Sequence, residues 1–251
     1  QDGTLVLTIN RPKVYNALSR DNKLRLVELI MDAGHNSSVR SVIITSHGKA
    51  FCTGQDLNDR TIKGGQEAVD LGKTLETEWN PLVTAIKECP KPVIAAVNGV
   101  CAGAGVSVAL ACDLIAARPD AKFVSGFTKI GLIPDAGSSH RFAKAMGPQK
   151  AFEFFAFNQP MLAEELASWG LINTPAEDPL AQGWEWARDL GKLAPLALET
   201  LKRNLRNGQD LPYHDMLEME IAGQRKLGQT EDYQEGLNAF FEKREPQFRG
   251  E

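Results

Sequence analysis

The chain has 251 residues, 43% of them hydrophobic, which is enough to build one large folded domain with a substantial core. Its formal net charge of −4 argues against a general nucleic-acid-binding protein and favours small-molecule partners. No apolar run approaches the roughly 18 residues that a membrane span needs, and no charged-then-apolar signal segment opens the chain. We therefore expect a soluble, cytoplasmic protein with neither a membrane nor a nucleic-acid partner.

Three β-branched runs predict strands in the first half of the chain, and each is followed closely by Asn or Gly. They are Thr4–Ile9, Ser41–Ser46 and 92–97. A helix is predicted over about 76–88, where the Pro90 and Pro92 break ends it. The polar segment 58–73 contains two adjacent glycines and has no steady period, so it is predicted to be a mobile loop.

The helix predicted between the first two strands has two candidate N-caps, Ser19 and Asp21. Its spacing predicts one apolar face, made of Leu24, Val27, Ile30 and Met31. Further helices are predicted from about residue 105 to 111 and from about residue 137. From residue 164 onward the pattern is almost wholly helical, with predicted helices over 184–193, 195–207 and 216–227. This order favours an α/β core followed by a helical region.

The four cysteines form no C-x-x-C pair and lie mostly in apolar stretches. They are Cys52, Cys89, Cys101 and Cys112. We interpret them as buried, reduced thiols and not as metal ligands or redox centres.

Two glycine-rich turns follow two of the predicted strands, in HGKAFCTGQDL at 47–57 and NGVCAGAGVSVALACD at 98–113. In the second turn, Gly103, Ala104 and Gly105 lead straight into an apolar helix. Small residues there let a ligand approach the N–H groups of a helix N-terminus, where the dipole favours negative charge. The turns are therefore a candidate oxyanion site, with tight helix-to-sheet packing as the alternative. The spacing does not fit the G-x-G-x-x-G dinucleotide motif.

One carboxylate, Asp135, stands between an apolar run and a predicted helix start in IGLIPDAGSSHRF. Local sequence alone favours a helix N-cap for this residue. Apolar neighbours would disfavour the charged carboxylate and make it a better base, whereas the helix start would lower its pKa. The expected apolar wall consists of Phe127, Ile130, Leu132 and Ile133.

Several ordered motifs resemble the crotonase, or enoyl-CoA hydratase/isomerase, superfamily, and together they span essentially the whole chain. They are RPKVYNALS, KAFCTGQDL, KPVIAAVNGVCAGAGVSVALACDLIAA, KFVSGFTKIGLIPDAGSSHRF and DYQEGLNAFFEKREPQF. The resemblance implies an α/β fold: a crotonase-like spiral of ββα units over 1–190 and a helical C-terminal trimerisation region over 191–251. It also implies an acyl-CoA substrate, no cofactor beyond the CoA of that substrate, and a homotrimer or dimer of trimers.

The resemblance assigns roles to individual positions. It implies that the backbone N–H groups of Gln55 and Ala104 hold the thioester oxygen. Hydratases of the superfamily use two glutamates, and the matching positions here are Ser107 and Phe127. The isomerase branches carry a single acid at the place of Asp135, which becomes the candidate proton shuttle for a 1,3-proton shift.

For the nucleotide end of CoA, the resemblance points to the RPKVYNAL turn and to the backbone around residues 54–57. The implied residues are Lys13, Val14, Gly54, Asp56 and Leu57. The cation of Lys13 is a candidate phosphate partner, and an ordinary solvated turn is the alternative.

Other polar residues are weaker candidates. His140 is a candidate for orienting Asp135 or a surface residue, and Glu153 faces either a cavity or the solvent. Asp113 is interpreted as a turn anchor, and Asp56 as the residue that holds the shape of its loop. Lys243 and Arg244 are candidates for reaching the ligand of a neighbouring subunit.

The sequence therefore predicts an acyl-CoA isomerase that shifts a double bond, or rearranges an epoxide or ring, and that resembles 1,2-epoxyphenylacetyl-CoA and 3,2-enoyl-CoA isomerases most. Three alternatives stay open. One is an enoyl-CoA hydratase, and another is a non-catalytic CoA-binding scaffold. The third resembles 4-chlorobenzoyl-CoA dehalogenases, in which an Asp attacks the ring, but those enzymes carry a Trp where Phe127 stands here.

Overall fold

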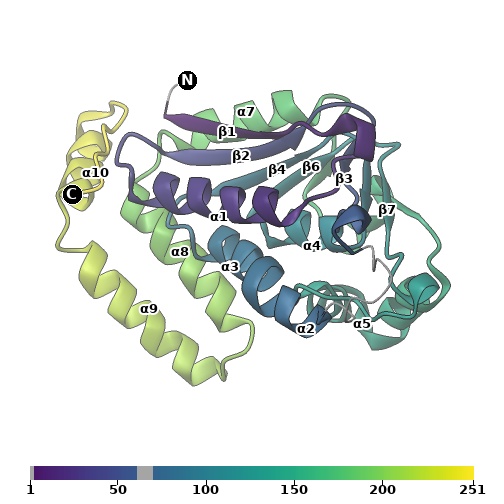
Figure 1. The fold of residues 1–251 in the computed structure, drawn as a ribbon. Helices are drawn as coiled ribbons and strands as arrows, with labels where there is room; N and C mark the ends of the chain where they lie inside the picture. Colours follow the sequence, from purple (N-terminus) through teal and green to yellow (C-terminus); the bar gives the residue numbers. More distant parts are fainter. Residues whose placement is uncertain (1–2, 61–69) are drawn as a thin grey trace.

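The protein is described by a computed structural model that covers residues 3–60 and 70–251 (Figure 1). Its centre is a parallel five-stranded sheet in the order β1-β2-β4-β6-β9. The strands are β1 (Thr4–Ile9), β2 (Ser41–Ser46), β4 (Val93–Val97), β6 (Leu114–Ala117) and β9 (Thr174–Pro175). The first two predicted strands are confirmed at both ends, and β4 begins one residue later than predicted, after Pro92, which has no N–H to donate.

Helices cover both faces of this sheet, as an all-parallel sheet requires (Figure 1). On one face, α7 (Pro179–Leu190) contacts β2, β4 and β6 through Ile43, Ile94 and Ala187. On the other face, α1 (Arg20–His35) and α3 (Asn80–Glu88) bury side chains such as Ile30 and Ile86. Side chains of alternate residues along β2 and β4 belong to the two separate cores.

The start of α1 is as predicted, and its buried face is confirmed in part. Ser19 is the N-cap and forms a capping box with Asn22. Of the predicted face, Ile30 is buried and Val27 packs against the core, whereas Met31 is 53% exposed. The other buried positions are Lys23, Leu26 and Ala33. The prediction missed Lys23 because the pattern of apolar residues gives no reason to bury a lysine.

A second, smaller sheet has the order β3-β5-β7-β8 and carries the glycine-rich turns. Its strands are β3 (Ala50–Cys52), β5 (Val100–Ala102), β7 (Lys122–Val124) and the antiparallel β8 (Met161–Leu162). They have two or three residues each, which is too short for a periodic pattern, so the sequence did not predict them.

The predicted helix over 76–88 is longer than expected. It begins with α2 (Leu71–Thr74), which Asp70 caps, and passes through a π-helical turn, η3 (Leu75–Trp79), into α3. The loop predicted over 58–73 lies mostly outside the described residues, since 61–69 are not described. On either side of that gap, η2 (Leu57–Arg60) and α2 are helical, so the prediction of a loop was wrong there.

Two helices lead from the second sheet toward the candidate site. The wholly buried α4 (Ala104–Ala111) follows β5, and α5 (Ser138–Phe157) follows the short η4 (Thr128–Ile130). Within α5, Gly147 has a φ of 79° and kinks the helix before Pro148. The Phe142 and Phe154 rings stack 4.5 Å apart in the core. The short α6 (Ala163–Ser168) completes this half of the molecule.

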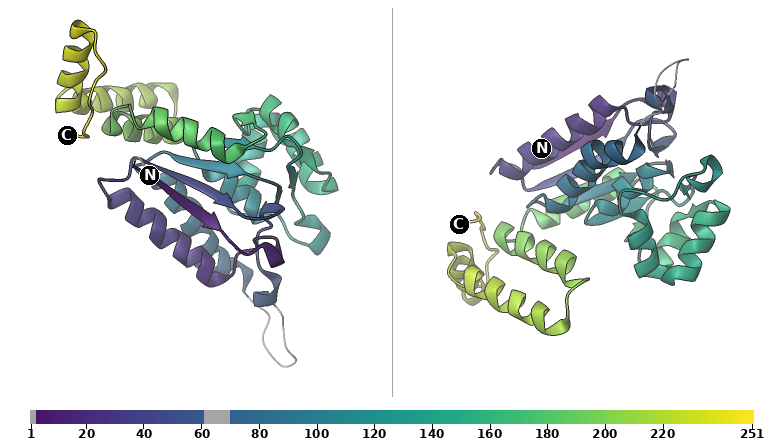
Figure 2. Two further views of the ribbon diagram at one scale, coloured as in Figure 1. Left: turned by 90° about the horizontal axis from the view of Figure 1, so that it is seen from above. Right: turned by 60° about the horizontal axis from the view of Figure 1, so that its bottom comes forward.

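The C-terminal helices are α8 (Pro195–Gly208), α9 (Tyr213–Leu227) and α10 (Glu231–Glu242). The Lys202 ammonium ties α8 to the core, since it lies 2.7 Å from Asp113 Oδ2 and donates to the Ile86 and Lys91 carbonyls. Helices α9 and α10 project away from the sheets (Figure 2). The predicted helices after residue 164 are confirmed, and no helix in 3–60 or 70–251 is long and apolar enough to cross a membrane.

Candidate active site

The two glycine-rich turns meet backbone to backbone. Gly54 has a φ of 84°, and a Cβ on it would lie 3.0 Å from the Ala104 amide nitrogen. A Cβ on Gly105 would lie 2.1 Å from the carbonyl oxygen of Cys52. Only glycine allows such an approach, so the structure brings the turns of Gln55 and Ala104 to one place.

Backbone hydrogen bonds fix the main chain of the first turn. The Leu18 amide donates to the Gly54 carbonyl at 2.7 Å, and the Asp56 amide donates to the Leu18 carbonyl at 3.0 Å. Gln55 lies between these two bonds and pairs with Leu18 as a parallel bridge. These two bonds constrain the Gln55 main chain on both sides.

The second turn ends at the N-terminus of α4. Gly103 is its N-cap, with a φ of 53°, and Ala104 is the first helical residue. The N–H groups of a first helical turn have no partner within the helix and lie at the positive end of its dipole. The N–H of Ala104 and the N–H of Gln55 would together form the expected oxyanion hole, in which the loss of one donor typically costs about 3 kcal/mol of barrier.

Asp135 does not cap α5. That helix begins at Ser138 with Gly137 as its N-cap and has no side-chain cap, so the capping hypothesis is wrong. Ala136 and Gly137 both have a positive φ, of 48° and 86°, and turn the chain before the helix starts. The half-buried Asp135 has a buried Oδ1 atom. A positive φ at a non-glycine residue such as Ala136 strains the backbone, and such strain is typical of functional sites.

The Asp135 backbone is held from two helices. Its carbonyl oxygen accepts hydrogen bonds from the hydroxyls of Ser107 on α4 and Ser138 on α5, both at 2.9 Å. It also accepts the Ser138 N–H at 3.1 Å. Ser107 thus joins α4 to the main chain of Asp135, a role that sequence reasoning missed. The only signal for it was one hydroxyl in the apolar run AGVSVALA.

The apolar wall expected around Asp135 is mostly absent. Phe127 is buried at 8% exposure, but Ile130 and Ile133 are 61% and 80% exposed. Leu132 is also exposed. These three residues lie at the turn after η4, where Gly131 has a φ of 75°.

Comparison with known proteins identifies the group to which this site belongs. Residues 1–251 match the family model "Enoyl-CoA hydratase/isomerase" over their whole length. The chain belongs to the enoyl-CoA hydratase/isomerase family. The 1,2-epoxyphenylacetyl-CoA isomerase of Escherichia coli is 36% identical over 100% of this chain and 96% of its own. A Rhodobacter capsulatus protein named as a probable enoyl-CoA hydratase is 38% identical over 99% and 95%.

A solved enoyl-CoA hydratase from Bacillus anthracis superposes with a TM-score of 0.92 at 29% identity, covering 99% of this chain and 96% of that one. The crotonase fold and the family predicted from the sequence are therefore confirmed. This enoyl-CoA hydratase/isomerase family member acts as an acyl-CoA hydratase or isomerase. The relative named as an isomerase and the relative named as a hydratase are about equally similar to it.

In this family member, the RPKVYNAL turn forms η1 (Pro12–Val14), with Lys13 exposed and Val14 half-buried. The following residues, Tyr15 and Asn16, both have a positive φ. Asn16 is wholly buried, and its amide donates to the His47 and Ala50 carbonyls at 2.8 and 2.6 Å. Sequence reasoning missed Asn16, which fastens the Lys13 turn to β3.

An ion pair joins the same turn to the oxyanion-hole loop. Arg11 Nη1 lies 2.8 Å from Asp56 Oδ2, and the Asn58 amide donates to Asp56 Oδ1 at 3.1 Å. Burial alone would raise the pKa of Asp56, but these hydrogen bonds outweigh it and hold the pKa below its usual value. The geometry matches the predicted role of Asp56 in holding the loop shape.

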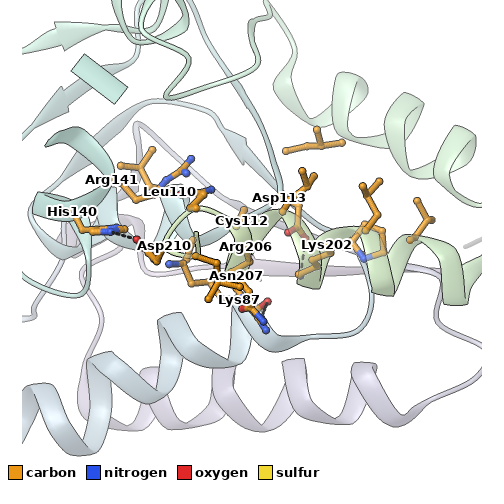
Figure 3. A pocket seen from close by; sticks show the side chains of 18 of the residues that line it. Lys87, Leu110, Cys112, Asp113, His140, Arg141, Lys202, Arg206, Asn207 and Asp210 are labelled. Atoms are coloured by element: carbon orange, nitrogen blue, oxygen red, sulfur yellow. Dashed lines mark hydrogen bonds and ion pairs between the residues drawn. The ribbon is translucent and has the colours of Figure 1, made fainter. Parts of the chain in front are cut away.

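Most of the weaker candidates pair with other charged residues. His140 Nε2 lies 3.5 Å from Asp210 Oδ1, and the exposed Glu153 pairs with Lys150. His140 and the Asp113–Lys202 pair line a separate cavity of about 780 Å³ between α8 and the end of α4 (Figure 3). In the isolated chain, Arg244 pairs with Glu235 and Glu242.

All four cysteines are free and buried, as predicted. Burial raises the pKa of the Cys52 thiol to about 12, so it stays protonated at neutral pH.

Proposed function

We propose that this family member is an isomerase that moves a double bond in an acyl-CoA thioester, or rearranges an epoxide or ring, with Asp135 as the proton shuttle. One observation carries the proposal. Of the two positions that match the hydratase glutamates, one holds the buried Phe127, and the other holds Ser107, whose hydroxyl is already bonded to the Asp135 carbonyl. Neither residue supplies a carboxylate for water addition.

The chemistry needs one carboxylate and two backbone donors. Asp135 removes a proton from C2 of a 3-enoyl thioester, and the negative charge moves onto the thioester oxygen. The N–H groups of Gln55 and Ala104 stabilise the resulting dienolate. Asp135 then returns its proton at C4, which leaves the double bond in conjugation with the thioester. No net proton is gained or lost, so a single acid suffices.

We place the nucleotide end of CoA along the turn joined by the Arg11–Asp56 pair. The backbone of Gly54, Asp56 and Leu57 and the Lys13 and Val14 turn would line it, with the exposed Lys13 ammonium as a phosphate partner. The support is proximity, because the Arg11–Asp56 contact at 2.8 Å joins the two turns directly.

We also propose a homotrimer, or a dimer of trimers, that acts in the cytoplasm. The C-terminal helices α8, α9 and α10 expose large apolar side chains, including Leu205 at 60%, Tyr213 at 79% and Phe240 at 77%. Exposed apolar surface of this kind is typical of subunit interfaces. Four free buried thiols are typical of a reducing compartment. The molar mass measured by light scattering tests the assembly.

The activity test offers the purified protein a 3-enoyl-CoA, and in parallel the 1,2-epoxide of phenylacetyl-CoA, the compound for which the E. coli relative is named. Isomerisation of the 3-enoyl thioester should produce the ultraviolet absorbance of a conjugated 2-enoyl thioester. Asp135→Asn should lower kcat by about 10²–10⁴-fold, the usual contribution of a general base. Asp120→Asn, at an exposed residue paired with Arg118, is the matched control and should leave kcat unchanged.

Hydration is the second candidate, because the 38% identical relative carries a hydratase name. Supplying a 2-enoyl-CoA in isotopically labelled water separates the two activities. Label in a 3-hydroxyacyl product at a rate above isomerisation would favour the hydratase. An active Asp135→Asn variant would overturn the assignment of the shuttle, and CoA binding without any turnover would favour the scaffold.

A further inference from the structure

A buried lysine lies next to the candidate oxyanion hole. The Lys23 side chain is 0% exposed, and its Nζ is 2.5 Å from Glu78 Oε2 and 2.7 Å from Gln55 Oε1. The same nitrogen lies 4.6 Å from the centre of the Trp79 ring. Trp79, itself 1% exposed, donates its indole N–H to Gln55 Oε1 at 3.1 Å. Four residues from α1, η3 and the oxyanion-hole loop thus form one connected network.

This arrangement is costly unless the charge is paired. Burying an ammonium group away from water strongly destabilises the folded state, and this cost is offset only when an opposite charge and further hydrogen bonds surround the group. Glu78 supplies the charge with a side chain only 12% exposed, and Gln55 and Trp79 supply further contacts. Glu78 Oε1 also lies 3.7 Å from Nε of the exposed Arg20. An apolar side chain would fill the same core position more simply. The buried Lys23–Glu78 ion pair therefore suggests a role beyond packing.

The backbone near Glu78 is also unusual. Glu78 and Trp79 belong to the π-helical turn η3, between the α-helical segments α2 and α3. A π-helical turn inserts one extra residue into a helix, and such insertions are frequent at functional sites. Here the inserted turn presents both side chains to Lys23 and Gln55.

The network fixes the Gln55 side chain at both ends of its amide. Oε1 accepts from the Lys23 ammonium and the Trp79 indole, which assigns the oxygen, and Nε2 donates to the Asp56 carbonyl at 3.1 Å. The Gln55 side chain and Glu78 also line a pocket of about 380 Å³. Gln55 is the residue whose main-chain N–H is assigned to the oxyanion hole.

We propose that Lys23, paired with Glu78, is a positioning residue that holds Gln55 so that its backbone N–H is aimed at the thioester oxygen before substrate arrives. The inference rests on the proposed oxyanion role of Gln55. Lys23 is wholly buried and therefore acts through Gln55 without touching the substrate. A preorganised donor stabilises developing charge without reorganisation during the reaction, so its effect falls on the transition state.

Three variants test the positioning role. Lys23→Met removes the cation, and the double variant Lys23→Met with Glu78→Gln removes both charges and leaves no unpaired carboxylate. Gln55→Ala leaves the ion pair intact and removes the side chain that it holds. Each should lower kcat about tenfold with KM within about twofold, because a misplaced donor costs transition-state stabilisation and not ground-state binding.

Thermal stability separates this role from a merely structural one. Lys23→Met should lower Tm, and the added Glu78→Gln change should restore most of Tm but not kcat. Lys202→Met is the matched control, since it breaks another lysine–carboxylate pair, between Lys202 and Asp113, whose members do not belong to the network around Gln55 (Figure 3). It should lower Tm and leave kcat unchanged.

A spectroscopic readout does not depend on the reaction. When the carbonyl of 4-(dimethylamino)cinnamoyl-CoA accepts stronger hydrogen bonds, its absorption band moves to longer wavelength. Wild-type protein should shift the band, and the three variants should shift it less. If the three variants shift the band less than the wild type does, the positioning role is supported. If the wild type also shows no isomerase turnover, the proposed reaction is refuted while the positioning role stands. A wild-type shift and an unchanged kcat in the folded double variant and in Gln55→Ala would overturn the positioning role.

Discussion

Replacing Gly105 with alanine perturbs the contact between β3 and the N-terminus of α4. An added Cβ would lie 2.1 Å from the Cys52 carbonyl oxygen, and real Cβ atoms essentially never approach within 3.0 Å. The two backbones must therefore separate by roughly 1 Å, and a misplacement of about 1 Å in a preorganised site costs about 10²-fold in rate. We expect kcat to fall about 100-fold, equivalent to about 2.7 kcal/mol of barrier.

The assay compares kcat and KM for a 3-enoyl-CoA in wild type, Gly105→Ala and Gly183→Ala. Gly183 lies in α7, where an added Cβ would sit 3.6 Å from Ile43, an ordinary contact. Both substitutions replace a helical glycine with alanine and gain up to about 1 kcal/mol of helix propensity. The Gly183→Ala control therefore differs in lacking the clash with a backbone carbonyl. Circular dichroism checks that both variants fold. A folded Gly105→Ala variant with wild-type kcat would refute the geometric argument.

Two further predictions concern the residues that hold the site. The folded-state pKa of Asp56 is lowered, so its carboxylate stabilises the fold above its unfolded pKa of about 3.9, and this contribution is lost as pH falls through the lower folded value. Asp56→Asn should therefore lower Tm at pH 7 and much less near pH 3 in calorimetry, and an equal loss at both pH values would contradict this linkage. Ser107→Ala removes one hydrogen bond to the Asp135 carbonyl, worth about 1 kcal/mol, and should lower kcat about fivefold in the isomerase assay. An unchanged kcat would show that the two Ser138 bonds suffice.

The parts of the fold that the sequence predicted are those with a local signal. β1 and β2 are β-branched runs of six residues ended by turn residues, and both ends match. The small residues of the turn at 103–105 indicated tight packing of a helix against a sheet as one alternative, and the structure shows such a close approach at Gly105. The three-residue β3 depends on its pairing with β5, and no pattern within it could reveal that.

The features that the sequence could not predict depend on partners far along the chain. Lys23 appears polar within α1, and its burial becomes understandable only with Glu78, 55 positions later. Asp135 followed by Ala, Gly and Ser is a typical capping sequence, and the positive φ of Ala136 is what moves the helix start to Ser138. Local propensity lost to tertiary geometry in both cases.

The hydroxyl of Ser107 sets a condition on how this chain could change its chemistry. The resemblance to hydratases implies that a glutamate at this position would supply one of their two acids. In this chain, Ser107→Glu would also delete the contact between α4 and the Asp135 carbonyl. Under the proposed function, this single substitution would weaken the support of the Asp135 segment and would supply only one of the two hydratase acids. An engineering or evolutionary route from the proposed isomerase to a hydratase would have to change Phe127 together with position 107, because one new glutamate alone does not supply both hydratase acids.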